Sequence, residues 1–377
     1  MTALAHLGAS LAALSARGLL RSRGGQLDPS ALVLCSNDYL GYATEEASPR
    51  SGAGASRLVS GDHPEHAALE RDLADWLHSE DALVFTSGYA ANVGLVSALG
   101  APGDVVISDE RNHASIIDGC RLSRARIVVV PHGDVEATRR ALIDARSAPH
   151  RYVITEGLFS MDGDTPDLGA LRALCDAEDA ALLVDEAHAI GVLGPEGRGA
   201  CAAAGVVPDA IIGTFGKALG GQGAFVAGPR VLCEWLWNRA RSFVFSTGLS
   251  PKVGAHVRGS VARARADEAG RARVAAIGAR LREALRELGY DVPANSHGPI
   301  VPVIIGAESA AVALSAALAA RGIHVGAIRP PTVAPGTSRL RVTVHAGLSE
   351  AAVERAIGAF RDARAPEAGH ASSRSGS

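Results

Sequence analysis

The sequence predicts an α/β protein in which a large domain with a mostly parallel, seven-stranded sheet is followed by a smaller C-terminal α+β domain. Short apolar runs alternate with helical patterns through the middle of the chain, as they do where helices connect parallel strands. After Pro251 the pattern changes to a long Ala/Arg-rich stretch and then to fewer strands. With 377 residues, the chain is long enough for two or three domains.

Seven apolar runs have the length of buried strands. The first six cover residues 82–85, 105–107, 127–130, 152–155, 181–184 and 210–215. The seventh, 224–227, follows after a short glycine-rich link, and a parallel crossover needs about a dozen residues, so we expect it to be antiparallel to its neighbour. In the C-terminal domain we expect one long helix from Pro251 to about residue 288 and strands at 300–305, 323–328 and 340–344.

These patterns divide the chain into four segments. They are an N-terminal helix and strand segment at 1–42, the large domain at 43–250, the small domain at 251–365 and a disordered tail at 366–377. Within residues 1–20 four leucines recur at helical spacing and no early positive charge is present, which favours a docking helix over a signal peptide. The tail is small and polar without periodicity.

The composition is that of a globular protein without a strong charge bias. Hydrophobic residues make up 47% and charged residues 20% of the chain, and the formal net charge is -3. Neither nucleic acid nor an anionic membrane is favoured as a partner, and no apolar run is long enough to span a bilayer. The five cysteines form no C-x-x-C pair, which argues against a zinc site or a disulfide framework and fits the reducing cytoplasm. We therefore expect no metal and a cytoplasmic location.

A lysine, a carboxylate and an imidazole follow two of the predicted strands. Lys217 follows the run 210–215 among several glycines, while Asp185 and His188 follow the run 181–184. Ligands bind at strand ends in open α/β sheets, so these side chains are expected to meet at one edge. Such a set suits pyridoxal phosphate, whose aldehyde forms a Schiff base with a lysine and whose ring nitrogen a carboxylate keeps protonated. Alone, Lys217 would be read as a surface residue and Asp185 as a helix cap.

Two further segments follow strand ends. In residues 86–92 a helix opens after a strand, so its N-terminus, with the hydroxyl of Ser87, can bind an anion, and Tyr89 adds an aromatic group beside it. Ordinary N-capping explains Ser87 equally well. His113 lies beyond another strand end, where it can stack on a planar ring, although a lone loop histidine is more often a surface residue.

Two patterns of charged residues have both a functional and a structural interpretation. Asp162 and Asp164 flank a glycine, but the segment 156–164 lacks the ligands of an EF-hand, so a tight turn presenting Ser160 is the better interpretation. Arg339 and Arg341 share one face of a predicted strand, where either could bind a carboxylate or form a salt bridge. The sequence has no P-loop, no G-x-S-x-G, no H-E-x-x-H and no complete dinucleotide fingerprint.

The motifs at 36–41, 87–92, 155–164, 185–188, 214–217 and 328–333 closely resemble those of the α-oxoamine synthases, which are fold-type-I pyridoxal-phosphate enzymes. The similarity runs from about residue 30 to 362 with the motifs in the family's order. The Arg-Pro-Pro-Thr-Val segment at 329–333 and residues 336–343 are most similar to members that condense L-alanine with a pimeloyl thioester, carried by coenzyme A or acyl carrier protein. The segment between Tyr42 and Gly52 is shorter than in other members, so the acyl entrance is expected to differ.

The resemblance implies roles for individual residues. Lys217 holds the cofactor and acts as the base, Asp185 pairs with the ring nitrogen, and His113 stacks on the ring. The remaining cofactor contacts that it implies are Ser87, Gly88, Tyr89, Ser160, His188 and Thr214, with Thr247 from the second subunit of a homodimer. The substrate contacts that it implies are Asn37 and Arg341 at the amino-acid carboxylate, Thr332 and Arg21 near the acyl group, and His113.

Two alternatives remain open at this point. The chain could be another α-oxoamine synthase that uses glycine or serine with a different acyl-CoA, which quinonoid formation with each amino acid would separate. It could also be a non-catalytic homologue that binds the cofactor and releases no thiol. The turn 245–248 that contains Thr247 reads, by itself, as a helix cap before Pro251.

Overall fold

The computed structural model describes residues 15–17, 32–34 and 52–364, which form two compact units. Of the described residues, the larger unit comprises 52–276 and 345–347, and the smaller unit comprises 15–17, 32–34, 277–344 and 348–364. The division falls within α11 (Glu268–Glu287), whereas the sequence predicted a boundary after residue 250. Helix α10 (Pro251–Ala266) belongs to the larger unit because it packs against α2 (Pro64–Leu77).

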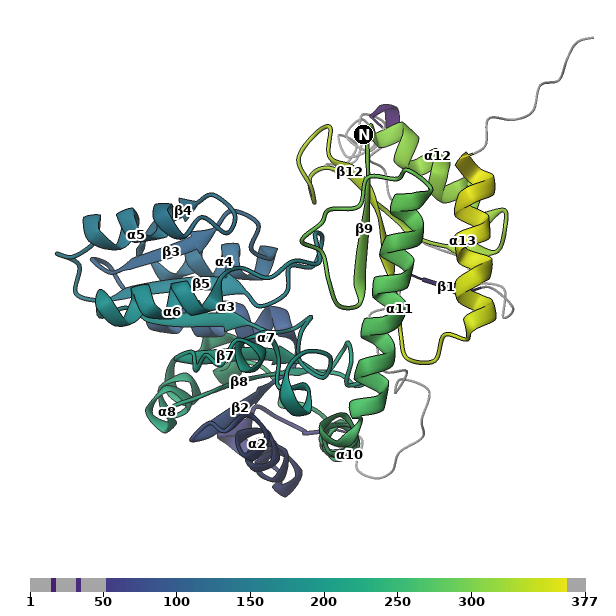
Figure 1. The fold of residues 1–377 in the computed structure, drawn as a ribbon. Coiled ribbons are helices and arrows are strands. Elements are labelled where there is room, and N and C mark those ends of the chain that lie inside the picture. The colour runs from purple at the N-terminus through teal and green to yellow at the C-terminus, as the bar shows by residue number, and fades with distance from the viewer. Residues whose placement is uncertain (1–14, 18–31, 35–51, 365–377) are drawn as a thin grey trace, which may run out of the picture. The chain divides into compact units, whose positions relative to one another are not determined.

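The larger unit contains the predicted seven-stranded, mostly parallel sheet (Figure 1). Its strand order is β2-β8-β7-β6-β5-β3-β4. The strands are β2 (Asp81–Phe85), β3 (Val105–Asp109), β4 (Arg126–Val130), β5 (Arg151–Glu156), β6 (Ala181–Asp185), β7 (Ala210–Thr214) and β8 (Ala224–Gly228). Strand β8 is antiparallel to both β7 and β2, as the short link before it predicted. The other neighbours are parallel.

Helices cover the sheet because its strands are apolar on both faces. One core cluster joins alternate strand residues, among them Ile154, Leu183 and Ile212, to α3 (Gly88–Leu99), α4 (Ala114–Ser123), α8 (Arg230–Arg239) and α9 (Arg241–Val244). Helices α5 (Val135–Asp144) and α6 (Leu168–Ala177) pack on β3, β4 and β6. The short elements of this unit are η2 (Arg57–Gly61), η3 (Pro195–Gly197) and α7 (Ala200–Ala203).

The smaller unit has a three-stranded antiparallel sheet in the order β11-β12-β9. Its strands are β9 (Ile300–Gly306), β11 (Gly326–Ile328) and β12 (Ser338–Thr343), with helices α12 (Glu308–Ala319) and α13 (Glu350–Arg364). A separate parallel pair joins β1 (Leu32–Val33) to β10 (Ile323–His324). The sequence predicted one strand at 323–328. The structure has two short strands there, β10 and β11, which pair with β1 and β12 respectively.

The long helix predicted after Pro251 is also two helices. α10 ends at Ala266, and Asp267 leaves the helical region with φ -84° and ψ 64° before α11 begins. Apart from residues 15–17 and 32–34, the predicted N-terminal segment lies outside the described residues, as do the short link at 43–51 and the tail from 366. The four cysteines in the described part of the chain are unpaired and buried. Within the same part, every helix is too short or too polar to cross a bilayer.

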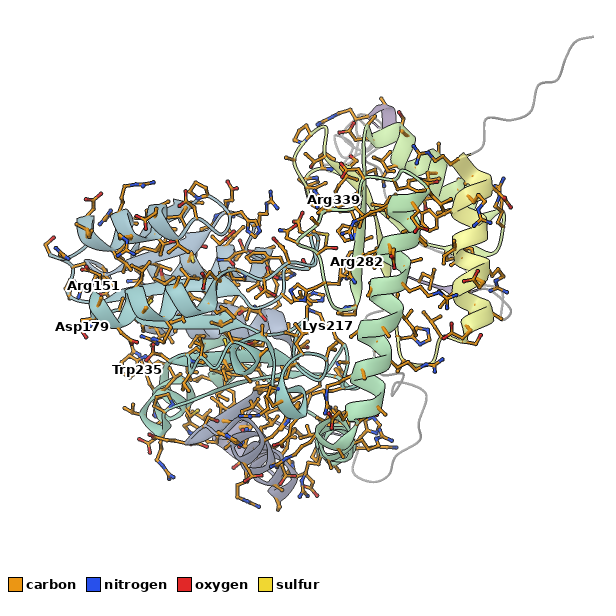
Figure 2. All side chains as sticks on the ribbon, in the orientation of Figure 1. Arg151, Asp179, Lys217, Trp235, Arg282 and Arg339 are labelled. Carbon is orange, nitrogen blue, oxygen red and sulfur yellow. The ribbon has the colours of Figure 1, made fainter. Side chains whose placement is uncertain are left out.

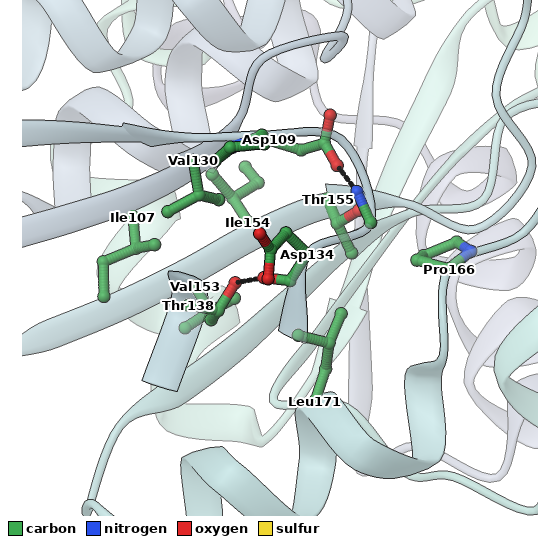
Figure 3. Close-up of a pocket in the computed structure, with 12 residues that line it drawn as sticks. Ile107, Asp109, Val130, Asp134, Thr138, Val153, Ile154, Thr155, Pro166 and Leu171 are labelled. Carbon is green, nitrogen blue, oxygen red and sulfur yellow. Dashed lines mark hydrogen bonds between the residues drawn. The ribbon is translucent and has the colours of Figure 1, made fainter. Parts of the chain in front are cut away.

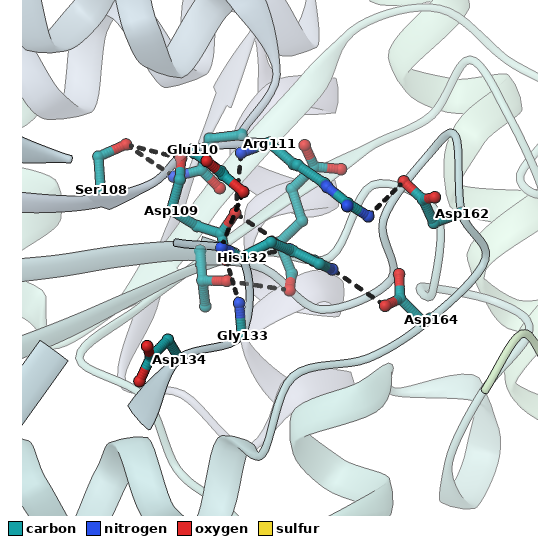
Figure 4. Close-up of polar contacts among 12 residues, drawn as sticks. Ser108, Asp109, Glu110, Arg111, His132, Gly133, Asp134, Asp162 and Asp164 are labelled. Carbon is teal, nitrogen blue, oxygen red and sulfur yellow. Dashed lines mark hydrogen bonds and ion pairs between the residues drawn. The ribbon is translucent and has the colours of Figure 1, made fainter. Parts of the chain in front are cut away.

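A partly buried imidazole fixes the loop that follows β5 (Figure 4). His132, in the turn after β4, donates from Nδ1 to Asp109 at 3.1 Å and from Nε2 to Asp164 at 3.0 Å. Asp162 pairs with Arg111 at 3.2 Å, so both acids of the 156–164 segment are engaged with side chains. A bond of 2.9 Å from the Gly163 N–H to the Phe159 carbonyl closes the predicted tight turn.

The two carboxylates keep this imidazole charged. Burial opposes the charge, but the hydrogen bonds to Asp109 and Asp164 outweigh it and raise the pKa of His132 to about 9. The raised pKa means that the stabilisation is complete below the ordinary histidine value of about 6.5 and is lost as the pH rises through the folded value. The loop is therefore held most firmly in neutral and mildly acidic solution.

We predict that His132→Gln lowers the free energy of unfolding by about 1.5–3 kcal/mol at about pH 6, the usual worth of hydrogen bonds to charged groups. The loss should shrink toward about pH 10, where the native imidazole is neutral. Urea unfolding of the purified protein across this range measures both values. His150→Gln is the matched control, because His150 is exposed and its replacement should change the free energy by less than about 0.5 kcal/mol. A loss of unfolding free energy that does not change with pH would contradict a charged His132 paired with Asp109 and Asp164.

Candidate functional site

Four polar side chains end the neighbouring strands of the larger unit. Asp109, Glu156, Asp185 and Thr214 are the last residues of β3, β5, β6 and β7. All four are buried, although most of their strand neighbours are apolar. Since these strands are parallel, their carboxyl ends meet at one edge of the sheet, where ligands bind in open α/β folds.

Asp185 is oriented from two sides at this edge. Its Oδ2 accepts from the Asn92 side chain on α3 at 2.7 Å, and its Oδ1 accepts from the Ala187 N–H at 2.9 Å. Only 5% of Asp185 is exposed. Asn92 Oδ1 is buried without a hydrogen-bond partner among the described residues. The carboxylate is thus held in one orientation without a cation bonded to it in the contacts described.

A hydrogen-bond chain links Asp185 to His113, the N-cap of α4. Asn92 Nδ2 also donates to Ser115 Oγ at 2.9 Å, and this hydroxyl lies 2.7 Å from His113 Nδ1. Since the hydroxyl accepts from Asn92, its hydrogen is available for Nδ1, which leaves the ring proton on Nε2. Burial lowers the pKa of His113, and the positive charge of Lys217 adds to that effect while Asp185 opposes it. The imidazole is therefore neutral, as stacking on a planar ring requires.

Lys217 lies in a tight connection between β7 and β8 (Figure 2). It is one of only two lysines in the chain, and the other, Lys252, is exposed on α10. The connection is closed by hydrogen bonds of 2.9 Å from Phe215 N to Gly223 O and 3.0 Å from Gly220 N to Lys217 O. Gly223 has φ +102°, which a residue with a side chain rarely adopts. The charge of Lys217 acts on both His113 and Glu156, so the amine belongs to the strand-end group.

The N-terminus of α3 lies against the end of β7. Ser87 is the N-cap and accepts from the Ala90 N–H at 3.1 Å, and a Cβ added to Gly88 would lie 3.8 Å from the Thr214 side chain. Thr214 Oγ1 donates to the Gly223 carbonyl at 3.0 Å. Exposed N–H groups and hydroxyls are thus gathered where a phosphate can bind. Tyr89 is half exposed, and its hydroxyl donates to Asp118 of α4.

The remaining predicted residues are distributed over both units. His188 is buried in the turn after β6, and the backbone N–H of Ser160 reaches the carboxyl group of Glu156. Thr247 is exposed in a turn that pairs with Ser56. In the smaller unit, Thr332 is exposed after β11 and Arg341 is buried within β12. Arg21 and Asn37 lie outside the described residues.

Three residues of the site were missed as functional residues in the sequence. Asn92 was seen only as part of a helix start, Ser115 only as a neighbour of His113, and Glu156 only as the beginning of a turn. Their common signal is a polar residue at or just after a strand end, the same signal that identified Asp185. Their pairing depends on strand register, which the sequence does not reveal.

A small pocket in the larger unit has Asp109 in its lining but none of Lys217, Asp185 and His113 (Figure 3). It lies among β3, β4, β5, α5 and α6, and its walls are mainly apolar, including Ile107, Val153 and Leu171. One of its two hydroxyls is already engaged, because Thr138 Oγ1 donates to the Asp134 carbonyl at 2.9 Å. We interpret it as a packing space between the sheet and its helices.

The strand-end residues fit pyridoxal phosphate. Lys217 supplies an amine for the aldehyde, Asp185 an oriented carboxylate for the ring nitrogen, and His113 a neutral ring for stacking. The hydroxyls and N–H groups near Ser87 suit the phosphate. Two buried oxygens at this edge, Asn92 Oδ1 and Glu156 Oε1, have no hydrogen-bond partner among the described residues. A polar ligand at this edge would satisfy such atoms, so the geometry and the donor set agree with the cofactor.

Comparisons with known proteins agree with this site. The family model of the class I and II aminotransferases matches residues 29–360. The 8-amino-7-oxononanoate synthase of Anaeromyxobacter dehalogenans strain 2CP-1 is 48% identical over 380 residues and covers 95% of each chain. Sphingomonas wittichii serine palmitoyltransferase has a TM-score of 0.89 at 32% identity, covering 96% of this chain and 98% of its own. A serine palmitoyltransferase solved with pyridoxal phosphate has a TM-score of 0.88 at 29% identity, with coverages of 96% and 97%.

The predicted fold and cofactor are confirmed by these relatives. The fold is that of the fold-type-I transferases, the cofactor is pyridoxal phosphate, and the chain is an acyltransferase. It belongs to the class I and II aminotransferase family and, within it, to the α-oxoamine synthases.

Proposed function

We propose that this chain condenses L-alanine with a pimeloyl thioester to give 8-amino-7-oxononanoate, carbon dioxide and the free thiol carrier, a step of biotin biosynthesis. The carrier is coenzyme A or acyl carrier protein, and the reaction takes place in the cytoplasm. The observation that carries the proposal is the strand-end group of Lys217, Asp185 and His113 in a chain 48% identical, over 95% of its length, to an 8-amino-7-oxononanoate synthase.

The reaction forms one carbon–carbon bond and breaks one carbon–sulfur bond and one carbon–carbon bond. The α-carbon of alanine joins the acyl carbonyl carbon while the carbon–sulfur bond breaks. The carboxylate of alanine then leaves as carbon dioxide, and the α-carbon takes up a proton. When bound, pyridoxal phosphate supplies an aldehyde that links to amines and a ring that draws electrons from the α-carbon.

The residues of the larger unit hold the cofactor and move protons. The Lys217 amine anchors the cofactor and removes the α-proton of alanine. Asp185, fixed by Asn92, keeps the proton on the ring nitrogen. His113 stacks on the ring and contacts the substrate. The further contacts that we assign to the cofactor are Ser87, Gly88, Tyr89 and Thr214 near the phosphate and Ser160 and His188 at the ring hydroxyl.

Residues of the smaller unit and the N-terminal segment are assigned to the substrates. Arg341 binds the carboxylate of alanine together with Asn37, because a guanidinium matches a carboxylate with two parallel hydrogen bonds. Thr332 and Arg21 lie near the acyl group. Burial of Arg341 within β12 supports this assignment, since a buried guanidinium has little rotamer freedom to lose on binding.

The active unit that we propose is a homodimer in which each site includes Thr247 of the partner subunit. The hydroxyls and N–H groups near Ser87 and Thr214 carry no positive charge of their own, so a further donor would help to hold the phosphate dianion. Thr247 is exposed in the 245–248 turn, beside the equally exposed Phe245. Its hydroxyl is therefore accessible to a second chain.

A second candidate is an α-oxoamine synthase that uses serine or glycine, which the likeness to serine palmitoyltransferase at 32% identity favours. The product mass after incubation with pimeloyl-CoA and L-alanine, glycine or L-serine tests the two against each other. We expect the 8-amino-7-oxononanoate mass with L-alanine, together with stoichiometric free coenzyme A. A preference for serine or glycine would support the second candidate, and cofactor binding without thiol release would indicate a non-catalytic homologue.

We predict that the purified protein is yellow and that Lys217→Ala abolishes both the visible band and turnover, because the imine to Lys217 is what gives the bound cofactor its colour. Borohydride reduction and peptide mapping should place the cofactor on Lys217. Lys252→Ala is the matched control at the only other lysine, and it should keep the band. Reduced cofactor on Lys252 would overturn the assignment.

A second prediction concerns the shared site. Thr247→Ala should weaken cofactor affinity by roughly ten- to a hundredfold, because a hydrogen bond to a charged group is worth about 1.5–3 kcal/mol. A Lys217→Ala chain mixed with a Thr247→Ala chain should regain activity, since one site of each heterodimer carries both lesions and the other carries neither. The mixture is assayed at a cofactor concentration that leaves the Thr247→Ala parent unsaturated.

The control for this mixture is a single chain that carries both Lys217→Ala and Thr247→Ala. Mixed with wild type, it should give no more activity than dilution predicts. If mass spectrometry shows exchanged subunits and activity still does not return, Thr247 serves its own chain.

A further inference from the structure

A second buried carboxyl group lies beside Asp185 and has no role in the reaction described so far. Glu156 ends β5, and the register of the parallel strands pairs it directly with Asp185 at the end of β6. The two side chains point to the same face of the sheet, the one covered by α3 and α4, because they alternate with Thr155 and Val184. Glu156 is 3% exposed. Two acids therefore share a site that excludes water.

The two oxygens of Glu156 have different surroundings. The backbone N–H groups of His113 and Ser160 lie close enough to its carboxyl group to favour the charged form. Its Oε1 is buried without a hydrogen-bond partner among the described residues, so these N–H groups act on Oε2. A carbonyl oxygen can accept two hydrogen bonds, so Oε1 is the oxygen that is left to carry a proton.

The surroundings of Glu156 disfavour its charged form. The titratable groups on the elements packed around it are Asp185 and His188 after β6, Asp109 and His113 after β3, and Lys217 after β7. Burial raises the pKa of Glu156 well above that of an ordinary glutamate, and Asp185 raises it further, while Lys217 and the two backbone N–H groups oppose this rise. Burial and the neighbouring carboxylate of Asp185 thus favour the neutral form of Glu156 over the anion, with Lys217 opposing them.

We propose that Glu156 is a positioning residue of the cofactor site that works as a neutral carboxylic acid. Oε2 fixes the backbone of His113 and Ser160, and the Oε1 hydroxyl donates to an oxygen of the bound cofactor. A buried O–H without an acceptor is costly, so the site is complete only when a ligand oxygen meets it. The inference rests on the cofactor and does not depend on which amino acid and acyl thioester react.

The test is the pH dependence of cofactor binding, measured by titrating apo-protein with pyridoxal phosphate from about pH 6 to about pH 10. Glu156→Gln imitates the neutral acid, with an oxygen that accepts and an amide that donates. We expect wild-type affinity to fall by up to tenfold per pH unit, relative to Glu156→Gln, once Glu156 ionises, because the anion faces the negatively charged cofactor. The protonation of the free cofactor changes with pH in the same way for both proteins, so it does not affect the ratio of their affinities. Glu156→Leu, which lacks both functions, should bind at least about tenfold more weakly near pH 7.

Glu186→Gln is the matched control. Glu186 is also a buried glutamate with a raised pKa, but it accepts from the Ala200 and Cys201 N–H groups of α7, so its replacement should keep the wild-type pH profile. Superimposable profiles of wild type and Glu156→Gln would overturn the proposal. So would Glu156→Gln binding as weakly as Glu156→Leu near pH 7, since it would mean that the negative charge is required. No acyl thioester enters the assay, so its outcome is independent of the proposed reaction.

Discussion

The constraint on which the site depends is the burial of two acids beside a partly buried amine at the carboxyl ends of parallel strands. Asp185 and Glu156 are register partners with almost no exposure, and the charge of Lys217 acts on Glu156. In such surroundings an unpaired charge is far more costly than in water, so the three groups must balance one another. With Glu156 neutral, as we propose, the site holds one carboxylate rather than two beside Lys217. It can therefore receive a cofactor that brings its own charges.

A second feature of the site is that hydrogen bonds orient its side chains. Asp185, Asn92, Ser115 and His113 form one continuous chain of hydrogen bonds between β6, α3 and α4. In a low-dielectric setting the loss of one member leaves its neighbours unsatisfied, which is more costly than the bond itself. The carboxylate and the imidazole are therefore oriented before any ligand arrives. Because these side chains are already oriented, less of the free energy of ligand binding is used to order the protein.

The sequence predicted what depends on local pattern and failed where distant partners decide. All seven strands of the large sheet and the antiparallel β8 were predicted, because each run and its link carry their own periodicity and length. Lys217 and Asp185 followed from their places after strands. The Glu156–Asp185 pairing was not predicted, because register is set by packing across the sheet. The break at Asp267 and the separation of β10 from β11 were missed for a similar reason: tertiary partners on each side override a uniform composition.

Two of the loops that carry the site are tied to the larger unit by polar side chains outside the chemistry. His132 binds the loop after β5 to the end of β3, and Glu186 binds the segment after β6 to the N-terminus of α7. The connection that carries Lys217 is held differently, because a Cβ on Gly213 would lie 2.2 Å from the Phe225 ring and only glycine lets β8 approach so closely. Ordering a loop costs about 1–2 kcal/mol per residue. These contacts offset that cost during folding, so the functional side chains are in place without any contribution from the ligand.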